Sequence, residues 1–305
     1  MKSNNKLLIF LLLASILGCL PFVFQSEKAE ANRVANNVTA AGYTPPMDSY
    51  SNRVGMYSIA RQLVTGATSP GRVRRSSDNS ETDMQFLNGE LDTSHLLTFV
   101  GANDGFVVSL NEQDGGTDIT QSTATAQPRI VISGSLVTSG GKPAMDFDGS
   151  SDWMLVDTAL VTFSGMTAYG IFQSDTTVGN HVGVLSSGGA GTDFYLPRIS
   201  GGLFRPTIPS GETGLVAADT AIHQISIWKS STQGAGFIDG SQIGPTKADT
   251  QTAGGVLTSM GGFNRSAVQA WDGKISELLI FSTAHNSGST RVAIEDNQSL
   301  FYSTP

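Results

Sequence analysis

The residues of this chain with the clearest chemical potential are its scattered carboxylates. Hydrolysis of a glycosidic bond uses two carboxyl groups that face each other across the bond, and their separation decides the stereochemical outcome. Candidates for such a pair are Glu112, Asp114, Asp118, Asp193 and Glu212. Nothing in their spacing places two of them opposite each other. The sequence therefore favours loop and turn roles for them, and it assigns no catalytic residue.

A further group of acids, Asp146, Asp148 and Asp152, lies within seven positions of the chain. Carboxylates on flexible loops supply the oxygen ligands that Ca²⁺ prefers, so the three are a candidate calcium site. The competing interpretation is turn chemistry, because Asp148 precedes a glycine and short Asp side chains bond their own backbone in turns. Calcium is the only cofactor that the sequence suggests.

Among the three tryptophans, Trp271 is the best candidate for contact with a sugar ring. Trp228 lies in an alternating stretch that predicts burial, whereas Trp271 adjoins the turn signal Asp272-Gly273. Asp114 and Asp118, on a Gly-rich loop, complete the candidate glycan-binding set. The alternative for both tryptophans is packing in the core.

Charge and cysteine content exclude several classes of protein. The 18 basic residues against 26 acidic residues give a net charge of −8, which argues against nucleic-acid binding. The single cysteine excludes a disulfide framework, and the four histidines show no metal-ligand spacing. The densest charge cluster is predicted to form internal ion pairs rather than a patch for an acidic partner, and it comprises Arg72, Arg74, Arg75, Asp78, Glu81 and Asp83.

The elements that position these residues are mainly short strands. A charged fraction of 14% and 35 glycines are typical of a β-type surface, and turn signals separate apolar runs of alternating pattern. Helices are expected over 51–64, 92–100 and 289–302. Strands are expected over 106–110, 129–133, 144–147, 153–156, 166–173, 181–186, 194–198, 224–229, 235–238, 256–260 and 275–281.

The N-terminal segment contains an uncharged apolar run over residues 7–24. Two lysines precede it and an Ala-Glu-Ala site follows it, so residues 1–31 are either a cleaved signal peptide or a retained membrane anchor; a lipoprotein signal at Cys19 ranks last. An anchor would use Leu7, Phe10, Leu13, Ile16 and Phe24. All three interpretations predict an extracytoplasmic protein. Residues 32–50 are expected to form a linker or stalk.

Two family resemblances emerge from short motifs. The stretches Phe147–Trp153, Gly236–Gly240 and Gly273–Phe281 resemble a laminin-G-like member of the concanavalin A-like lectin/glucanase superfamily. Further upstream, motifs resemble the N-terminal part of α-L-arabinofuranosidase B catalytic domains, and similar blocks occur in bacteriophage structural proteins. These motifs are Ile59–Leu63, Val73–Asn79, Thr82-Asp83, Gly105–Val108 and Thr120-Gln121.

The departures from the arabinofuranosidase pattern concern its chemistry. An Asn111–Asp118 loop replaces the enzymes' Asp-Gln-Ser-Gly-Asn-Gly-like loop. The enzymes carry their catalytic carboxylates in the middle of the domain. In this chain the corresponding region, roughly 181–211, has Asp193 as its one carboxylate. The family's cysteines are also missing. The resemblance thus predicts the fold better than the activity.

Together these observations predict a mostly β, concanavalin A-like jelly-roll sandwich over residues 51–305, with short flanking helices and an N-terminal hydrophobic helix. The favoured function is a non-enzymatic, exported or membrane-anchored lectin-like module, such as a phage virion spike or receptor-binding protein that contacts host glycans. The alternatives are an exported arabinofuranosidase-like glycoside hydrolase and a purely structural minor capsid or surface protein. Expected partners are a cell-surface glycan or other virion or surface proteins, the membrane, and a second copy in a homo-oligomer.

Overall fold

The computed structural model describes residues 43–156, 164–187, 194–251, 257–263, 269–286 and 288–305. The expected anchor residues and most of the expected linker therefore lie outside the described residues, as does Asp193. Within the described ranges, no helix is both long and apolar enough to cross a membrane. The residues from Pro45 onward belong to one compact unit.

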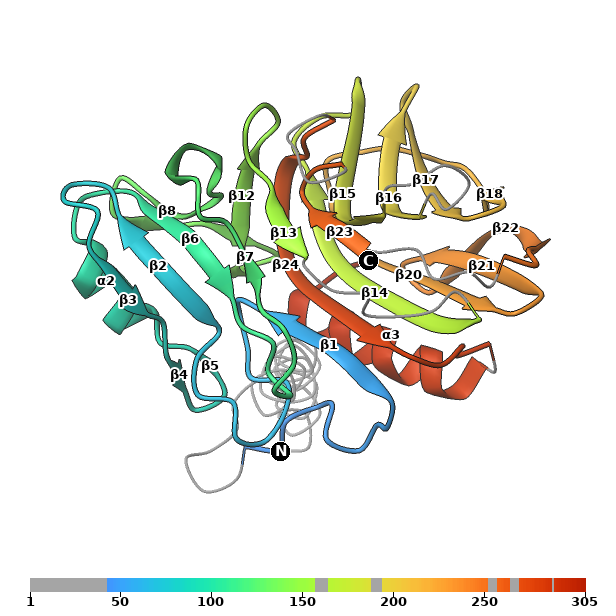
Figure 1. Cartoon of the computed structure of the whole chain (residues 1–305), viewed down its shortest axis with the longest axis horizontal. Helices are drawn as coiled ribbons and strands as arrows, with labels where there is room; N and C mark the ends of the chain where they lie inside the picture. Colours follow the sequence, from blue (N-terminus) through green and yellow to red (C-terminus); the bar gives the residue numbers. More distant parts are fainter. Residues whose placement is uncertain (1–42, 157–163, 188–193, 252–256, 264–268, 287) are drawn as a thin grey trace, which may run out of the picture. The chain divides into compact units, whose positions relative to one another are not determined.

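That unit is mostly β, as expected, and its strands are antiparallel (Figure 1). The longest strands form a first layer around β24 (Asp272–Phe281), which pairs with β14 on one edge and with β1 and β12 along its other edge. The order across this layer is β22 (Ser241–Ala248), β21 (Gln233–Ile238), β20 (Ile222–Ser230), β14 (Gly165–Ser174), β24, and then β1 (Arg53–Ser58) and β12 (Met145–Asp148).

A second layer packs against the first. Its order is β7 (Ile119–Thr120), β13 (Met154–Val156), β23 (Leu257–Met260), β15 (Asn180–Ser187), β16 (Phe194–Ser200) and β17 (Leu203–Ile208), which also pairs with β18 (Gly211–Glu212) and β19 (Val216–Ala217). The buried side chains of the two layers, among them Phe172, Ile225, Val184 and Leu196, form one hydrophobic core.

The first layer continues beyond β12 into a smaller group of strands, where the candidate site lies. These strands are β8 (Arg129–Ile132), β9 (Ser135–Leu136), β6 (Gly105–Leu110), β2 (Gly71–Arg75) and β3 (Glu81–Asp83). The short elements nearby are the hairpins β4 (Phe86–Leu87) with β5 (Glu90–Leu91) and β10 (Thr138–Ser139) with β11 (Lys142–Pro143), the helix α2 (Thr93–Val100) and the 3-10 turn η1 (Ala124–Ala126).

The C-terminal helix α3 (Gly288–Tyr302) covers the outer face of β14 and β20 (Figure 1). This cover explains why β20 is buried on both faces although its sequence alternates. Ile225 and Ile227 belong to the core, while Gln224 donates a hydrogen bond to Gln298 of α3 at 3.2 Å and Ser226 bonds Glu295. A polar strand face can be buried because the helix supplies partners for it.

Most expected elements are confirmed, with ends that differ by a few residues. Helix α2 begins after Asp92, whose side chain accepts from the His95 N–H, and it ends at Gly101. The helix expected over 51–64 is wrong, because Arg53–Ser58 is strand β1. Met56 and Tyr57 are both fully buried, on opposite faces of this strand, and pairing with the buried β24 overrides the helical spacing. The strands that lie outside the expected ranges include β2, β3, β17 and β22.

Candidate functional site

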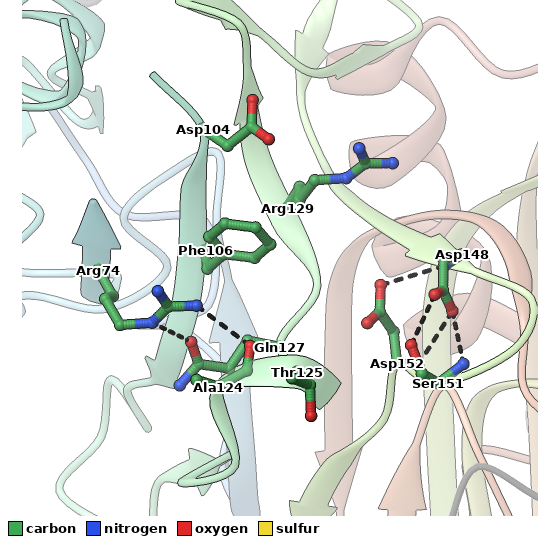
Figure 2. Close-up of a pocket in the computed structure, with 10 residues that line it drawn as sticks. All are labelled: Arg74, Asp104, Phe106, Ala124, Thr125, Gln127, Arg129, Asp148, Ser151 and Asp152. Carbon is green, nitrogen blue, oxygen red and sulfur yellow. Dashed lines mark hydrogen bonds between the residues drawn. The ribbon is translucent and has the colours of Figure 1, made fainter. Parts of the chain in front are cut away.

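An open hollow of about 520 Å³ lies between the strands β2 and β6 and the turn that joins β12 to β13 (Figure 2). Its walls combine carboxylates, guanidinium groups and one aromatic ring. The lining residues are Arg74, Asp104, Phe106, Ala124, Thr125, Gln127, Arg129, Asp148, Ser151 and Asp152.

Arg74 gives one wall a fixed shape. Its guanidinium lies over the Phe106 ring, 4.6 Å from the centroid, and donates to Gln127 Oε1 at 2.8 Å, Asn79 Oδ1 at 2.8 Å and the Ala124 carbonyl at 3.1 Å. Arg74 is only 8% exposed, so these bonds replace water for a buried cation. We infer that Arg74 holds the wall in place rather than binding a ligand.

Asp104 lies on the same side of the hollow, immediately before β6 (Figure 2). Its Oδ1 accepts the backbone N–H of Ser133 at 2.7 Å, and its own N–H donates to Ser76 Oγ at 3.1 Å. These contacts fix a partly exposed carboxylate between the ends of β6 and β8.

Asp148 organises the opposite wall. Its carboxylate accepts the N–H and hydroxyl groups of Ser150 and Ser151 at 2.6–2.9 Å, and the N–H of Asp152 at 3.0 Å. Burial alone would raise its pKa, but the bonds from Ser151, Ser150 and Asp152 outweigh burial and hold the pKa well below its ordinary value. Asp148 is therefore ionised at neutral pH, at the centre of a tight turn.

Asp152, on the same turn, has a raised pKa, whereas that of Asp148 is lowered. Its side chain is buried, and its Oδ2 accepts the Asp148 N–H at 3.2 Å. Burial, with the repulsion of the charged Asp148, raises the pKa of Asp152 to about 7. Adjacent carboxyl groups whose pKa values are pushed apart are the arrangement that lets one act as an acid at neutral pH while the other stays ionised.

The candidate calcium ligands receive other partners in this structure. Asp146 pairs with Arg129 at 2.9 Å and lies 3.9 Å from Lys274, while the Asp148 oxygens are occupied by the turn. Across the residues that the structure describes, no group of three or more His, Cys, Asp or Glu side chains could hold a metal ion. The turn interpretation of Asp148 thus describes the local geometry, and calcium binding stays a prediction.

The structure separates the residues expected to bind a glycan. Trp271 is fully buried, with its ring 5.7 Å from that of Phe172, so it is not available to stack on a sugar; the expectation of an exposed ring is wrong. The loop turns the tryptophan inward because its backbone pairs with Gly261 and Gly149. Asp114 pairs with Arg53 at 2.8 Å at the edge of a separate hollow, and Asp118 accepts the Glu112 N–H at 2.9 Å.

The other acids considered as catalytic candidates have structural partners. Glu112 is 7% exposed and accepts three backbone N–H groups, from Met56, Asp114 and Gly116. Glu212 pairs with Arg205 at 2.7 Å. In the charge cluster, Arg72 pairs with Asp83 at 2.8 Å and Arg75 with Asp78 at 2.6 Å, so these ions do pair locally, as expected.

The central feature of the hollow does not follow from the sequence: Asp104 and Asp152, from two distant parts of the chain, line it from opposite walls (Figure 2). One signal was present: the block Val73–Asn79 and the Gly105–Val108 strand, on which the arabinofuranosidase resemblance rested, supply one wall. The other wall comes from the Phe147–Trp153 motif, which carries the laminin-G-like resemblance.

Comparison with known proteins finds relatives of this fold among solved structures alone. No family model and no curated protein matches the sequence. A solved arabinofuranosidase in complex with arabinofuranosyl-α-1,2-xylobiose matches with a TM-score of 0.68 and 14% identity, over 85% of this chain and 65% of that one. A GH54 α-L-arabinofuranosidase soaked with 4-nitrophenyl α-L-arabinofuranoside matches with a TM-score of 0.66 and 15% identity, over the same shares.

This chain therefore spans 65% of the length of the arabinofuranosidases that it matches. A Trypanosoma rangeli sialidase also matches, with a TM-score of 0.49 and 12% identity, over 93% of this chain and 40% of that one, which is too distant to support an argument. The matches support the arabinofuranosidase resemblance at the level of the fold. They do not confirm the concanavalin A-like or laminin-G-like assignments.

The same matches correct the expected function. A non-enzymatic lectin-like module of a phage spike conflicts with a fold whose solved counterparts are glycoside hydrolases. Neither the Asn111–Asp118 loop nor the region 181–211, where the motifs depart from the arabinofuranosidase pattern, contributes a residue to the hollow. The chain has the β fold of the α-L-arabinofuranosidases.

Proposed function

We propose that this protein is an exported glycoside hydrolase that acts on arabinofuranoside-like linkages at the hollow between β6 and the β12–β13 turn. The observation that carries the proposal is Asp152, a buried carboxyl group whose pKa is raised to about 7 and which lines an open hollow together with Asp104. The fold shared with arabinofuranosidases supports the substrate class.

The chemistry follows from the two carboxyl groups. Asp152 keeps its proton near neutral pH and donates it to the oxygen of the leaving group as the glycosidic bond breaks. Asp104 is partly exposed on the other wall and acts as the second carboxylate, either on the sugar carbon directly or through a water molecule. Burial raises the pKa of Asp152, and the charge of the ionised Asp148 raises it further.

Hydrolysis of 4-nitrophenyl α-L-arabinofuranoside, followed by the release of nitrophenol, tests the proposal. The variants Asp152→Asn and Asp104→Asn should each lower kcat by at least about 100-fold, the scale of general acid–base catalysis. The matched control is Asp114→Asn, which removes a carboxylate at a different hollow and should leave kcat within about twofold.

The dependence of kcat on pH is a second test of the proposal. Because Asp152 must be protonated to act as the acid, kcat should fall as the pH rises through about 7. The proposal would be refuted if the wild-type protein released neither nitrophenol from this substrate nor arabinose from arabinose-substituted xylan, or if wild type and Asp152→Asn hydrolysed the substrate at equal rates.

A further inference from the structure

The ring of Phe106 gives the hollow between β6 and the β12–β13 turn an aromatic surface (Figure 2). Its neighbour Val107 belongs to the core, and successive side chains of a strand point to opposite faces, so Phe106 lies on the face of β6 away from the core. Its antiparallel partners are Arg74 on β2 and Arg129 on β8, so an arginine lies on each side of it. Among the described residues that line the hollow, Phe106 is the only aromatic one.

One face of the Phe106 ring is covered by a cation that is itself held in place. The Arg74 guanidinium carbon lies 4.6 Å from the ring centroid. Three hydrogen bonds fix this guanidinium, to Gln127, Asn79 and the Ala124 carbonyl. Because Arg74 occupies one face and the ring also lines the hollow, Phe106 presents its remaining face and its edge there. The ring is thus held in one orientation before any ligand arrives.

Hydrogen-bonding groups of both kinds surround the ring. Asp104, two positions earlier in the chain, offers a carboxylate whose Oδ1 accepts the Ser133 N–H. The Arg129 side chain is 33% exposed and pairs with Asp146 through Nη2 at 2.9 Å. Asp152 lines the opposite wall. An apolar ring flanked by a few fixed donors and acceptors is the usual composition of a site for a small organic ligand.

We propose that Phe106 is the platform on which the sugar ring of an arabinofuranoside stacks. A furanose ring has a face of C–H groups, which packs on the aromatic face, and a rim of hydroxyl groups, which exchange hydrogen bonds with Arg129 and Asp104. Because Arg74 already holds the Phe106 ring, little side-chain freedom is lost on binding. The choice of an arabinofuranoside over another hydroxylated ring rests on the proposed function.

Titration calorimetry of the full chain with methyl 1-thio-α-L-arabinofuranoside tests the platform, because the sulfur linkage resists hydrolysis. The wild type should bind this analogue. Phe106→Leu keeps an apolar side chain but removes the ring, and it should weaken binding at least about fivefold, the scale of an aromatic ring contact. Phe106→Tyr keeps the ring and should restore the wild-type affinity. The matched control is Phe99→Leu, which removes a ring that lies 5.0 Å from the Arg75 guanidinium carbon outside the hollow, and it should leave the affinity unchanged.

Proton NMR of the bound analogue gives a signal that a purely structural role of Phe106 would not produce. The ring current of a stacked aromatic ring shifts the C–H protons of the sugar face upfield. The same protons should show nuclear Overhauser contacts to the Phe106 ring, and both signals should be lost in Phe106→Leu. Because both are observed on the wild type, they decide the proposal even if Phe106→Leu does not fold.

The proposal would be overturned by any of three results: no binding of the analogue by the wild type, an unchanged affinity in Phe106→Leu, or no upfield shift. Calorimetry and NMR detect binding without turnover, so the two proposals fail separately. If the analogue stacks on Phe106 but 4-nitrophenyl α-L-arabinofuranoside is not hydrolysed, the proposed hydrolysis is wrong and the platform stands. If hydrolysis depends on Asp152 but Phe106→Leu binds as tightly as wild type, the platform is wrong and the hydrolysis stands.

Discussion

Replacement of Asp152 by Asn tests the raised pKa at the centre of the site without any assumption about substrate. The pKa of this carboxyl rises from its ordinary value of 3.8 to about 7 in the folded protein. A carboxyl that binds its proton more tightly when folded makes the protein most stable below pH 4, and this stability is lost as the pH rises toward 7.

The size of the effect follows from the shift. Each pKa unit corresponds to 1.36 kcal/mol, so the shift of Asp152 sets a ceiling of about 4 kcal/mol. The side chain lines an open hollow, and screening by solvent there reduces the expected effect to about 2 kcal/mol. Asn keeps the oxygen that accepts the Asp148 N–H but cannot ionise.

Urea unfolding of the wild type and of Asp152→Asn, at half-unit steps from pH 4 to pH 8, measures this difference. The free energy of unfolding of the variant should gain about 2 kcal/mol on that of the wild type between pH 4 and pH 8. All other titrating groups contribute equally to both proteins, so their contributions cancel in the difference. If the free energies of unfolding of the two proteins change in parallel with pH, the pKa of Asp152 is not raised and Asp152 is not the proton donor.

Two further predictions concern buried ions. Two contacts of 2.8 Å join the Arg61 guanidinium to the Glu277 carboxylate. Glu277→Gln removes this counter-ion and should lower the free energy of unfolding in urea by about 3–5 kcal/mol. The control is Glu90→Gln, at the more exposed pair with Lys142, which should cost under about 1 kcal/mol. The second prediction concerns His223. Burial alone would lower its pKa, but the bonds to Asp239 at 2.6 Å and Asp219 at 2.8 Å outweigh burial and raise it. His223 should therefore stabilise the fold below about pH 6.5, and this contribution should be lost as the pH rises through the pKa of the folded protein. In His223→Gln that decline should be absent, and a histidine pKa at or below 6.5 by NMR would contradict the assignment.

The sequence by itself determined the mostly β class and most strand positions, because period-two apolar patterns between Gly and Asp turn signals reflect local backbone preferences. It also determined α2, since the Asp92 cap and Gly101 are neighbours of the helix that they bound. The run Leu278–Phe281 is apolar at every position, which is typical of a central strand, and β24 pairs on both edges.

Only the tertiary structure decided features that depend on distant segments. Met56 and Tyr57 form a strand because β24 lies beside them, and Trp271 is buried because its loop folds against Gly261 and Gly149. Asp104 and Asp152 are 48 positions apart and line one hollow because β6 and the β12–β13 turn meet across β8. The pKa of Asp152 likewise depends on burial and on the charge of Asp148, and neither burial nor the distance between charges is a property of the sequence pattern.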